Sequence, residues 1–131
     1  MAEKKLHACA RALIVEDDPA IRRLLQKILV RSGIEIDTVQ DGKHAIEKIS
    51  SGHYSVIVLD LMIPEVNGFE IIEYVKANKI DVPIAVVSAV SQQALTRLDL
   101  DIVKLVITKP FDVDELTKAI LEICREREAA T

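Results

Sequence analysis

Short apolar runs and longer segments with the periodicity of a helix alternate five times along the chain. The apolar runs are bounded by glycine, proline or charged residues, so we interpret them as β-strands. They cover approximately residues 10–15, 35–39, 54–59, 83–87 and 105–108. Between them, apolar residues recur every three or four positions, as on one face of a helix. This order of elements predicts a doubly wound α/β domain built on a parallel sheet.

Two of the predicted strands differ in the burial that we expect. The run at 54–59 is apolar on both faces, which is typical of a central strand in a parallel sheet. The run at 35–39 carries polar residues and is predicted to be an edge strand. Residues 91–98 are predicted to form a short helix, whereas the pattern assigns no element to residues 100–104.

The first and last predicted helices have recognisable terminal signals. Asp18 is suited to cap the first helix, and Pro19 fits its first position. Gly33 is expected to take a left-handed conformation just after that helix ends. Asp112 and Glu115 have the spacing of a capping box for the last helix. The core-facing positions of the first helix are predicted to be Ile21, Leu24, Leu25, Ile28 and Leu29.

Length and composition limit the classes of function. The 131 residues suffice for one domain with an aliphatic core. The net charge of −4 and the content of two Tyr, two Phe and no Trp argue against a nucleic-acid interface. The apolar runs are too short to cross a bilayer, and the amino-terminal stretch resembles a strand more than a signal peptide. Cys9 and Cys124 show neither disulfide nor metal spacing. Together with the short apolar runs, this predicts a cytoplasmic protein without membrane contact.

Polar side chains follow four of the five predicted strands at the point where each strand ends. They are Glu16 and Asp17, then Asp60, Ser88 and Lys109. Each of them alone has an ordinary explanation as a helix cap, a turn residue or a solvated loop charge. In a parallel sheet, however, all carboxyl ends lie at one edge, where open α/β sheets bind ligands. We therefore predict that these side chains meet in one site.

The chemistry of such a site follows from its charges. Three carboxylates close together repel one another, so the site must raise a pKa or bind a cation. An all-oxygen ligand set favours Mg²⁺ or Mn²⁺ over zinc. A divalent ion with open positions, together with the charge of Lys109 and the hydroxyl of Ser88, is suited to a phosphoryl group. Asp60 could then act as the nucleophile and form an acyl phosphate.

At these residues the chain resembles the receiver domain of two-component response regulators, over nearly its full length. The matching segments are Val15-Glu16-Asp17-Asp18-Pro19 with Ile21-Arg22, Leu59-Asp60-Leu61-Met62-Ile63-Pro64 through Asn67-Gly68, Val87-Ser88-Ala89, and Thr108-Lys109-Pro110-Phe111. The resemblance implies a flavodoxin-like fold: a five-stranded parallel sheet of order 2-1-3-4-5, flanked by five helices. Residues 1–131 would form a single receiver domain with its core at about 10–127.

The resemblance also implies a role for each site residue. Asp60 would accept a phosphoryl group, and Asp17, Asp60 and the backbone carbonyl of Met62 would hold Mg²⁺, with Mn²⁺ as an alternative. Glu16 would reach the ion through water. Lys109 would pair with the phosphoryl group or with Asp60, and a cis peptide bond to Pro110 would aim it inward. Ser88 would hydrogen-bond the phosphoryl oxygen.

The implied partners are proteins. The phosphoryl donor would be a phosphohistidine on a sensor histidine kinase or a phosphotransfer protein, and an unknown downstream protein would read the result. The chain would not be an enzyme acting on a third molecule, since it would catalyse only its own phosphorylation and dephosphorylation.

The chain departs from the family pattern at three places. The Gly-Ala pair that usually precedes the fifth strand is missing. Met62 and Val90, two residues beyond Asp60 and Ser88, are apolar and cannot orient an attacking water, which predicts a long-lived phosphoryl group. Val106 stands where receivers usually carry a Tyr or Phe, so the usual aromatic switch cannot operate there. The readout is therefore expected to use backbone shifts around residues 88–90 and in the predicted helix at 91–98.

The sequence disfavours three alternative functions. A degenerate receiver would bind its partner without phosphorylation, but the complete set of polar site residues speaks against it. An aspartyl-phosphate phosphatase of the haloacid-dehalogenase type needs a second Asp two residues after the nucleophile, where this chain has Met62. A nucleotide site lacks the glycine-rich loop that would have to follow the first strand.

Overall fold

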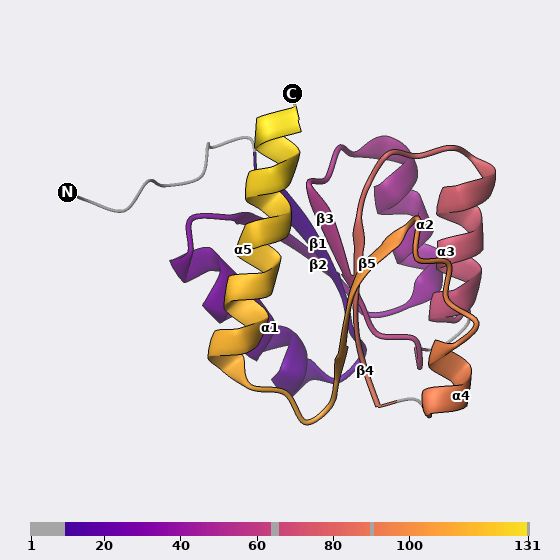
Figure 1. The fold of residues 1–131 in the computed structure, drawn as a ribbon, viewed down its shortest axis with the longest axis horizontal. Coiled ribbons are helices and arrows are strands. Elements are labelled where there is room, and N and C mark those ends of the chain that lie inside the picture. Colours follow the sequence, from indigo (N-terminus) through magenta and orange to yellow (C-terminus); the bar gives the residue numbers. More distant parts are fainter. Residues whose placement is uncertain (1–9, 64–65, 90, 131) are drawn as a thin grey trace.

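The computed structural model describes residues 10–63, 66–89 and 91–130. Its centre is a parallel sheet of five strands in the order β2-β1-β3-β4-β5, which confirms the predicted doubly wound fold (Figure 1). The strands are β1 (Arg11–Val15), β2 (Glu35–Val39), β3 (Val56–Leu59), β4 (Ile84–Ser88) and β5 (Val103–Thr108). The helices are α1 (Pro19–Arg31), α2 (Gly42–Ser51), α3 (Gly68–Ala77), α4 (Gln92–Leu95) and α5 (Val113–Ala130).

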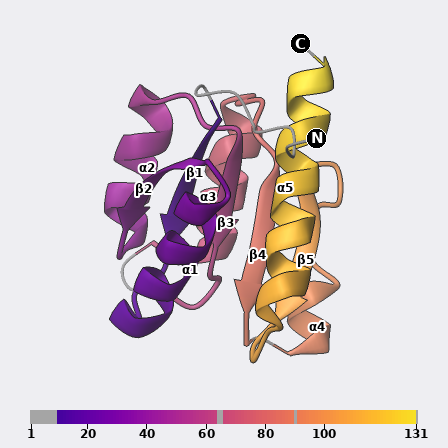
Figure 2. The same ribbon diagram turned by 90° about the vertical axis from the view of Figure 1, so that its left-hand side faces the viewer.

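Helices cover both faces of the sheet, as the two perpendicular views show (Figure 2). Side chains of β1 alternate between the faces, because successive residues of a strand point in opposite directions. Ala12 and Ile14 pack with buried residues of α1 and α5, whereas Leu13 and Val15 pack with those of α2 and α3. All four residues of β3 are buried, and β2 is an edge strand, as the sequence predicted.

The residues predicted to begin and end α1 are confirmed, but fewer of its side chains face the core than the sequence predicted. The Asp18 side chain accepts hydrogen bonds from the backbone amides of Ala20 and Ile21, and Gly33 has a φ of +88°. Leu25 and Leu29 are fully buried. The prediction for Leu24 was wrong: it is 41% exposed, because one step of about 100° around the helix turns it away from the sheet.

The segment before β5 differs most from its prediction. α4 contains only Gln92–Leu95, shorter than the predicted helix at 91–98, and β5 begins at Val103, two residues earlier than expected. The reason is a turn centred on Asp99, whose side chain accepts from the amide of Asp101 and whose carbonyl accepts from the amides of Ile102 and Val103. This turn ends the helical path and directs the chain into the sheet.

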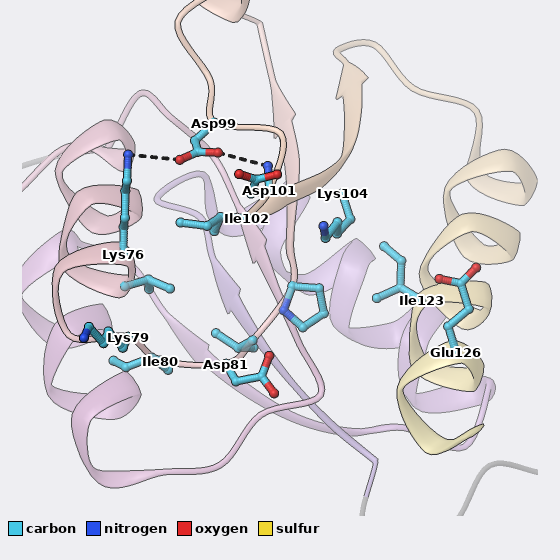
Figure 3. Close-up of a pocket in the computed structure, with 13 residues that line it drawn as sticks. Lys76, Lys79, Ile80, Asp81, Asp99, Asp101, Ile102, Lys104, Ile123 and Glu126 are labelled. Carbon is cyan, nitrogen blue, oxygen red and sulfur yellow. Dashed lines mark hydrogen bonds and ion pairs between the residues drawn. The ribbon is translucent and has the colours of Figure 1, made fainter. Parts of the chain in front are cut away.

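Two side-chain contacts connect α3 to this turn. The guanidinium of Arg97 lies 5.3 Å from the centre of the Phe69 ring, close enough for a cation–π contact. The ammonium of Lys76 lies 3.1 Å from a carboxylate oxygen of Asp99. The ion pair borders a pocket of about 600 Å³ at the amino-terminal ends of β4 and β5 (Figure 3). The pocket thus lies at the end of these strands opposite to Ser88 and Lys109.

Some sequence predictions concern residues outside those described. Cys9 and Val90 belong to this group, so the expectations stated for them stay predictions. Cys124 is buried among the side chains that link α5 to the sheet, in agreement with a structural role.

Candidate functional site

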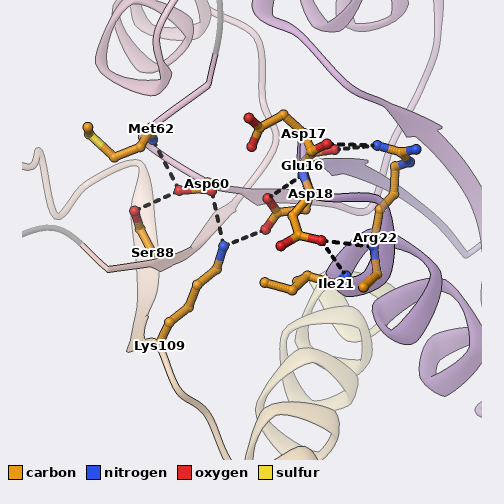
Figure 4. Close-up of polar contacts among 10 residues, drawn as sticks. Glu16, Asp17, Asp18, Ile21, Arg22, Asp60, Met62, Ser88 and Lys109 are labelled. Atoms are coloured by element: carbon orange, nitrogen blue, oxygen red, sulfur yellow. Dashed lines mark hydrogen bonds and ion pairs between the residues drawn. The ribbon is translucent and has the colours of Figure 1, made fainter.

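The polar residues that follow the strands meet at the carboxyl edge of the sheet. Glu16 follows β1, Asp60 follows β3, Ser88 ends β4 and Lys109 follows β5 (Figure 4). Three of them, Glu16, Asp60 and Ser88, are the buried polar residues of the described chain, with exposed fractions of 1%, 6% and 1%. Because burying polar groups is costly unless they are paired, their partners define what the site can do.

Asp60 is at the centre of the site and has partners on both carboxylate oxygens. Its Oδ1 accepts hydrogen bonds from the hydroxyl of Ser88 at 2.7 Å and from the backbone amide of Met62 at 3.1 Å. Its Oδ2 accepts from Nζ of Lys109 at 3.1 Å. Three donors from different parts of the chain therefore hold the Asp60 carboxylate in place.

Lys109 connects Asp60 to Glu16. Its ammonium lies 2.7 Å from Glu16 Oε1, so its shorter contact is with Glu16 and not with Asp60. Burial works against the charge of Lys109, but the hydrogen bonds to the two carboxylates outweigh it and raise the pKa of the lysine. Lys109 is therefore charged at neutral pH. The predicted pairing with Asp60 is present, whereas the closer pairing with Glu16 was not foreseen.

Glu16 experiences two opposing influences. Burial raises the pKa of its carboxyl above the usual range, while the hydrogen bonds from Lys109 and from the amide of Asp18 act in the other direction. The net effect is a raised pKa, with the negative charge of Asp60 contributing to the rise. The hydrogen bond from Lys109 therefore opposes the effect of burial on the Glu16 carboxyl.

The backbone of Lys109 is hydrogen-bonded to the end of β4. Its amide donates to the carbonyl of Ser88 at 3.0 Å, which continues the pairing of β5 with β4 and places the lysine beside Ser88. The peptide bond between Lys109 and Pro110 is cis, as the resemblance implied.

The acidic residues fit a divalent cation. Glu16, Asp17 and Asp60 each offer a carboxylate oxygen, and these oxygens lie within 4.8 Å of one another. Glu16 and Asp60 are buried and Asp17 is exposed, so the cluster opens toward solvent on one side. Hard oxygen donors of this kind suit Mg²⁺. A single lysine cannot neutralise three carboxylates, which leaves the cluster with an excess of negative charge.

A glycine makes room for the loop that follows Asp60. Gly68 begins α3, and its amide donates to the carbonyl of Leu61 at 3.1 Å. A Cβ atom at Gly68 would lie 2.5 Å from the Cα of Leu61 and 2.9 Å from the carbonyl oxygen of Asp60. Such distances are far below van der Waals contact, so the close approach of α3 to the Asp60 loop requires glycine at this position.

Arg22 is a neighbour of the site to which the sequence analysis assigns no role, although it belongs to the first segment that matches receiver domains. Its Nη1 donates to the carbonyl of Glu16 at 3.0 Å and to that of Asp17 at 3.4 Å. Its place in the first turn of α1 lets the long side chain reach back to the preceding loop.

Two departures from the family pattern, Met62 and Val106, are both partly exposed. Met62 is 66% exposed beside Asp60, and its role as a carbonyl ligand stays a prediction. Val106 lies on β5, an edge strand, with 37% of its surface exposed. It offers no ring that could turn inward, so the position that usually holds an aromatic residue presents a short branched side chain.

Comparison with known proteins agrees with the fold and identifies the family. The response regulator receiver domain model matches residues 12–121. The chain therefore belongs to the response regulator receiver domain family, the signalling modules of two-component systems.

Within the described residues, no helix is both long and apolar enough to span a membrane.

Curated relatives and solved structures show the extent of the similarity. The chain is 34% identical over 116 residues to the transcriptional regulatory protein TcrA of Mycobacterium tuberculosis, covering 88% of this chain and 46% of that protein. It is 35% identical to the response regulator ArlR of Staphylococcus aureus, covering 88% and 52%. The chain thus spans about half the length of these relatives.

Two solved structures of response regulators illustrate the similarity of the fold. The receiver domain of the Francisella response regulator 1452 superposes with a TM-score of 0.83 at 26% identity, over 89% of this chain and 98% of that one. The response regulator TrrA from Thermotoga maritima, in complex with Mg(2+)-BeF, gives a TM-score of 0.78 at 32% identity, over 87% and 98%.

Proposed function

We propose that the chain is a phosphoacceptor receiver domain in which Asp60 accepts a phosphoryl group and thereby changes the binding of a partner protein. The observation that carries the proposal is the convergence on Asp60 of a lysine ammonium, a serine hydroxyl and two further carboxylates. Receiver domains of response regulators receive phosphate from histidine kinases. The donor here would accordingly be a phosphohistidine on a sensor histidine kinase or on a phosphotransfer protein.

The chemical step is a transfer onto the Asp60 carboxylate. One of its oxygens attacks the phosphorus atom, the bond between phosphorus and the imidazole nitrogen of the donor breaks, and that nitrogen keeps the bonding electron pair. The chain contributes position and charge, since its groups are already held in the low-dielectric site before the donor arrives.

Lys109 and Ser88 would follow the negative charge as it moves. Lys109 lies beside Oδ2 of Asp60 and can neutralise an incoming phosphoryl oxygen without leaving the site. Ser88 donates to Oδ1 of Asp60 before the reaction, so its hydroxyl has to turn from the carboxylate to a phosphoryl oxygen afterwards. That exchange of hydrogen-bond partners would be the first structural consequence of phosphorylation.

Glu16, Asp17 and Asp60, with the backbone carbonyl of Met62, would hold Mg²⁺, and Mn²⁺ is the alternative with the same oxygen preference. The bound ion would neutralise charge on the transferred phosphoryl oxygens. The complex of TrrA with Mg(2+)-BeF, a protein 32% identical to this chain, supports the assignment.

The proposal is tested with a small phosphodonor. The protein is incubated with Mg²⁺ and acetyl phosphate, and its intact mass is measured. We expect the mass of one added phosphoryl group in the wild type, none in Asp60→Asn, and unchanged modification in the control Asp101→Asn, which alters an exposed residue at the opposite edge of the sheet. No modification of the wild type, or modification of Asp60→Asn, would refute the assignment and favour a receiver that acts without phosphorylation.

The lifetime and the readout are part of the proposal. Since Met62 and Val90 offer no polar group to orient water, the phosphoryl group should persist, and its loss within seconds without a phosphatase would contradict this. Because Val106 cannot act as an aromatic switch, the signal should pass through the backbone near Ser88. Identical amide spectra of the two forms around residues 88 and 89 would exclude that route.

A further inference from the structure

The loop between β1 and α1 carries two of the three carboxylates of the site, and its parts are held in different ways. Glu16 is fixed through its side chain, which accepts from Lys109 at 2.7 Å and from the amide of Asp18 at 3.2 Å. Asp18 is fixed as the cap of α1, through its contacts with the amides of Ala20 and Ile21. Both neighbours of Asp17 are thus anchored by their side chains.

Asp17 itself lacks such an anchor. In the described part of the chain its carboxylate makes no hydrogen bond or ion pair with another side chain. Its carbonyl, however, accepts from Nη1 of Arg22 at 3.4 Å, and the same nitrogen donates to the carbonyl of Glu16 at 3.0 Å. One guanidinium nitrogen therefore connects two successive peptide units of the loop to the first turn of α1.

Figure 4 shows where Arg22 lies relative to the site. Its guanidinium is on one side of the loop, and Asp60 and Lys109 are on the other. The arginine therefore holds the backbone from behind and leaves the carboxylate of Asp17 within 4.8 Å of those of Glu16 and Asp60.

We propose that Arg22 is a positioning residue for the divalent cation site, which holds the backbone of Glu16 and Asp17 so that the Asp17 carboxylate stays beside Asp60. This inference rests on the proposed function, because it assumes that the acidic cluster binds Mg²⁺. Residues that orient metal ligands from behind typically contribute about 10-fold to 100-fold in metal affinity.

The direction of the effect separates this role from a purely electrostatic one. A guanidinium near a cation site repels the cation, so removing its charge alone would make Mg²⁺ bind more tightly. Losing the two hydrogen bonds would instead free the loop, and ordering it again on binding would weaken Mg²⁺ affinity. Positioning and simple charge therefore predict changes of opposite sign.

The test uses Arg22→Gln and the matched control Arg23→Gln. Both variants remove one positive charge from the same turn of α1, but Arg23 is an exposed residue outside the loop contacts described above. Mg²⁺ alone is titrated into each protein by calorimetry. We expect the Kd of Arg22→Gln to rise about 10-fold, that of Arg23→Gln to stay within about twofold of the wild type, and Arg22→Lys to fall between wild type and Arg22→Gln. Equal or tighter binding by Arg22→Gln overturns the proposal.

Two further measurements separate positioning from loss of structure. Urea unfolding shows whether Arg22→Gln is folded; if it is not, Arg22→Lys decides, and wild-type affinity in that variant overturns the inference. With acetyl phosphate, the Mg²⁺ concentration for half-maximal modification should rise more than the maximal rate falls. If the wild type and Arg22→Gln bind Mg²⁺ equally well, only the positioning role of Arg22 is refuted. If the wild type does not bind Mg²⁺, the proposed function is refuted as well.

Discussion

Replacing Lys109 by methionine should lower the free energy of unfolding, because the repulsion between the buried carboxylates is then no longer offset by the lysine charge. The ammonium is the charge shared by Glu16 and Asp60, at 2.7 Å and 3.1 Å, and the three side chains are only 16%, 2% and 7% exposed. Removing one partner from a buried ion pair costs about 3–5 kcal/mol. A domain of this size has a total stability of about 5–15 kcal/mol, so the loss in Lys109→Met would be a large part of it.

The cost should depend on pH, with a sign that follows from Glu16. Burial already raises the pKa of Glu16 in the wild type, and the opposing hydrogen bond from Lys109 disappears in the variant, so the pKa rises further. A carboxyl whose pKa is higher in the folded than in the unfolded state binds more protons when folded, so stability falls as pH rises. The loss of stability in the variant should therefore be small below the raised pKa of Glu16, where its carboxyl is protonated in the fold, and largest above that pKa.

Urea unfolding followed by far-ultraviolet circular dichroism measures this effect, since the chain has no Trp. With an m-value of about 1.5 kcal/mol per molar urea, the expected loss lowers the midpoint by about 2–3 M at about pH 7.5. Lys118→Met, which removes an exposed lysine from α5, is the matched control and should change the stability by less than about 0.5 kcal/mol. A Lys109→Met protein as stable as this control at pH 7.5, or one that loses more stability at about pH 5, would refute the reasoning.

Three further expectations test other parts of the fold. Gly68→Ala should destabilise the domain by about 1–3 kcal/mol in urea unfolding, because the new Cβ would meet the backbone of the loop after β3 at 2.5 Å; wild-type stability would contradict the close approach. The hydrogen bond that His44 Nδ1 donates to the Asp41 carboxylate raises the pKa of His44 above its usual value of about 6.5, so this pair stabilises α2 at low pH and the contribution is lost as pH rises through the raised pKa. An imidazole titration by NMR should show that pKa move down in Asp41→Asn, and no movement would disprove the pairing. Burial, together with a hydrogen bond to a carboxylate of β2, raises the pKa of Tyr54 to about 12, so in Tyr74→Phe the phenolate absorbance of the folded protein should appear near that pH; ionisation near pH 10 would contradict it.

The sequence predicted the topology and the site because both depend on periodic or strongly local signals. An apolar run such as 54–59 has few alternatives to a buried strand, and a charged residue directly after it has to lie at the sheet edge. Parallel strands bring Glu16, Asp60, Ser88 and Lys109 to one edge whatever the details of the loops. The resemblance to receiver domains added the strand order and the cis bond before Pro110, and the structure contains both.

What the sequence did not predict depends on side-chain reach or on competition between weak signals. Nothing in the pattern indicates that Lys109 lies nearer to Glu16 than to Asp60, or that Arg22 reaches back to two carbonyls. The pattern assigns no element to residues 100–104 because β5 is an edge strand whose burial alternates, so its apolar signal is weak. Leu24 was misplaced because an apolar residue on a helix surface gives the same pattern as a buried one.

The two contacts that connect α3 to the turn before β5 respond to different conditions. Phe69 and Lys76 are seven residues apart, which is about two helical turns or 10 Å, so they hold the turn at two separate points. The ion pair of Lys76 with Asp99 is exposed and weakens as salt is added, whereas the packing of Arg97 on a ring retains its apolar component. Ionic strength therefore acts on one end of this connection more than on the other. A rise in salt should loosen the Asp99 end, next to the strand that carries Val106, and leave the end nearer α4 in place.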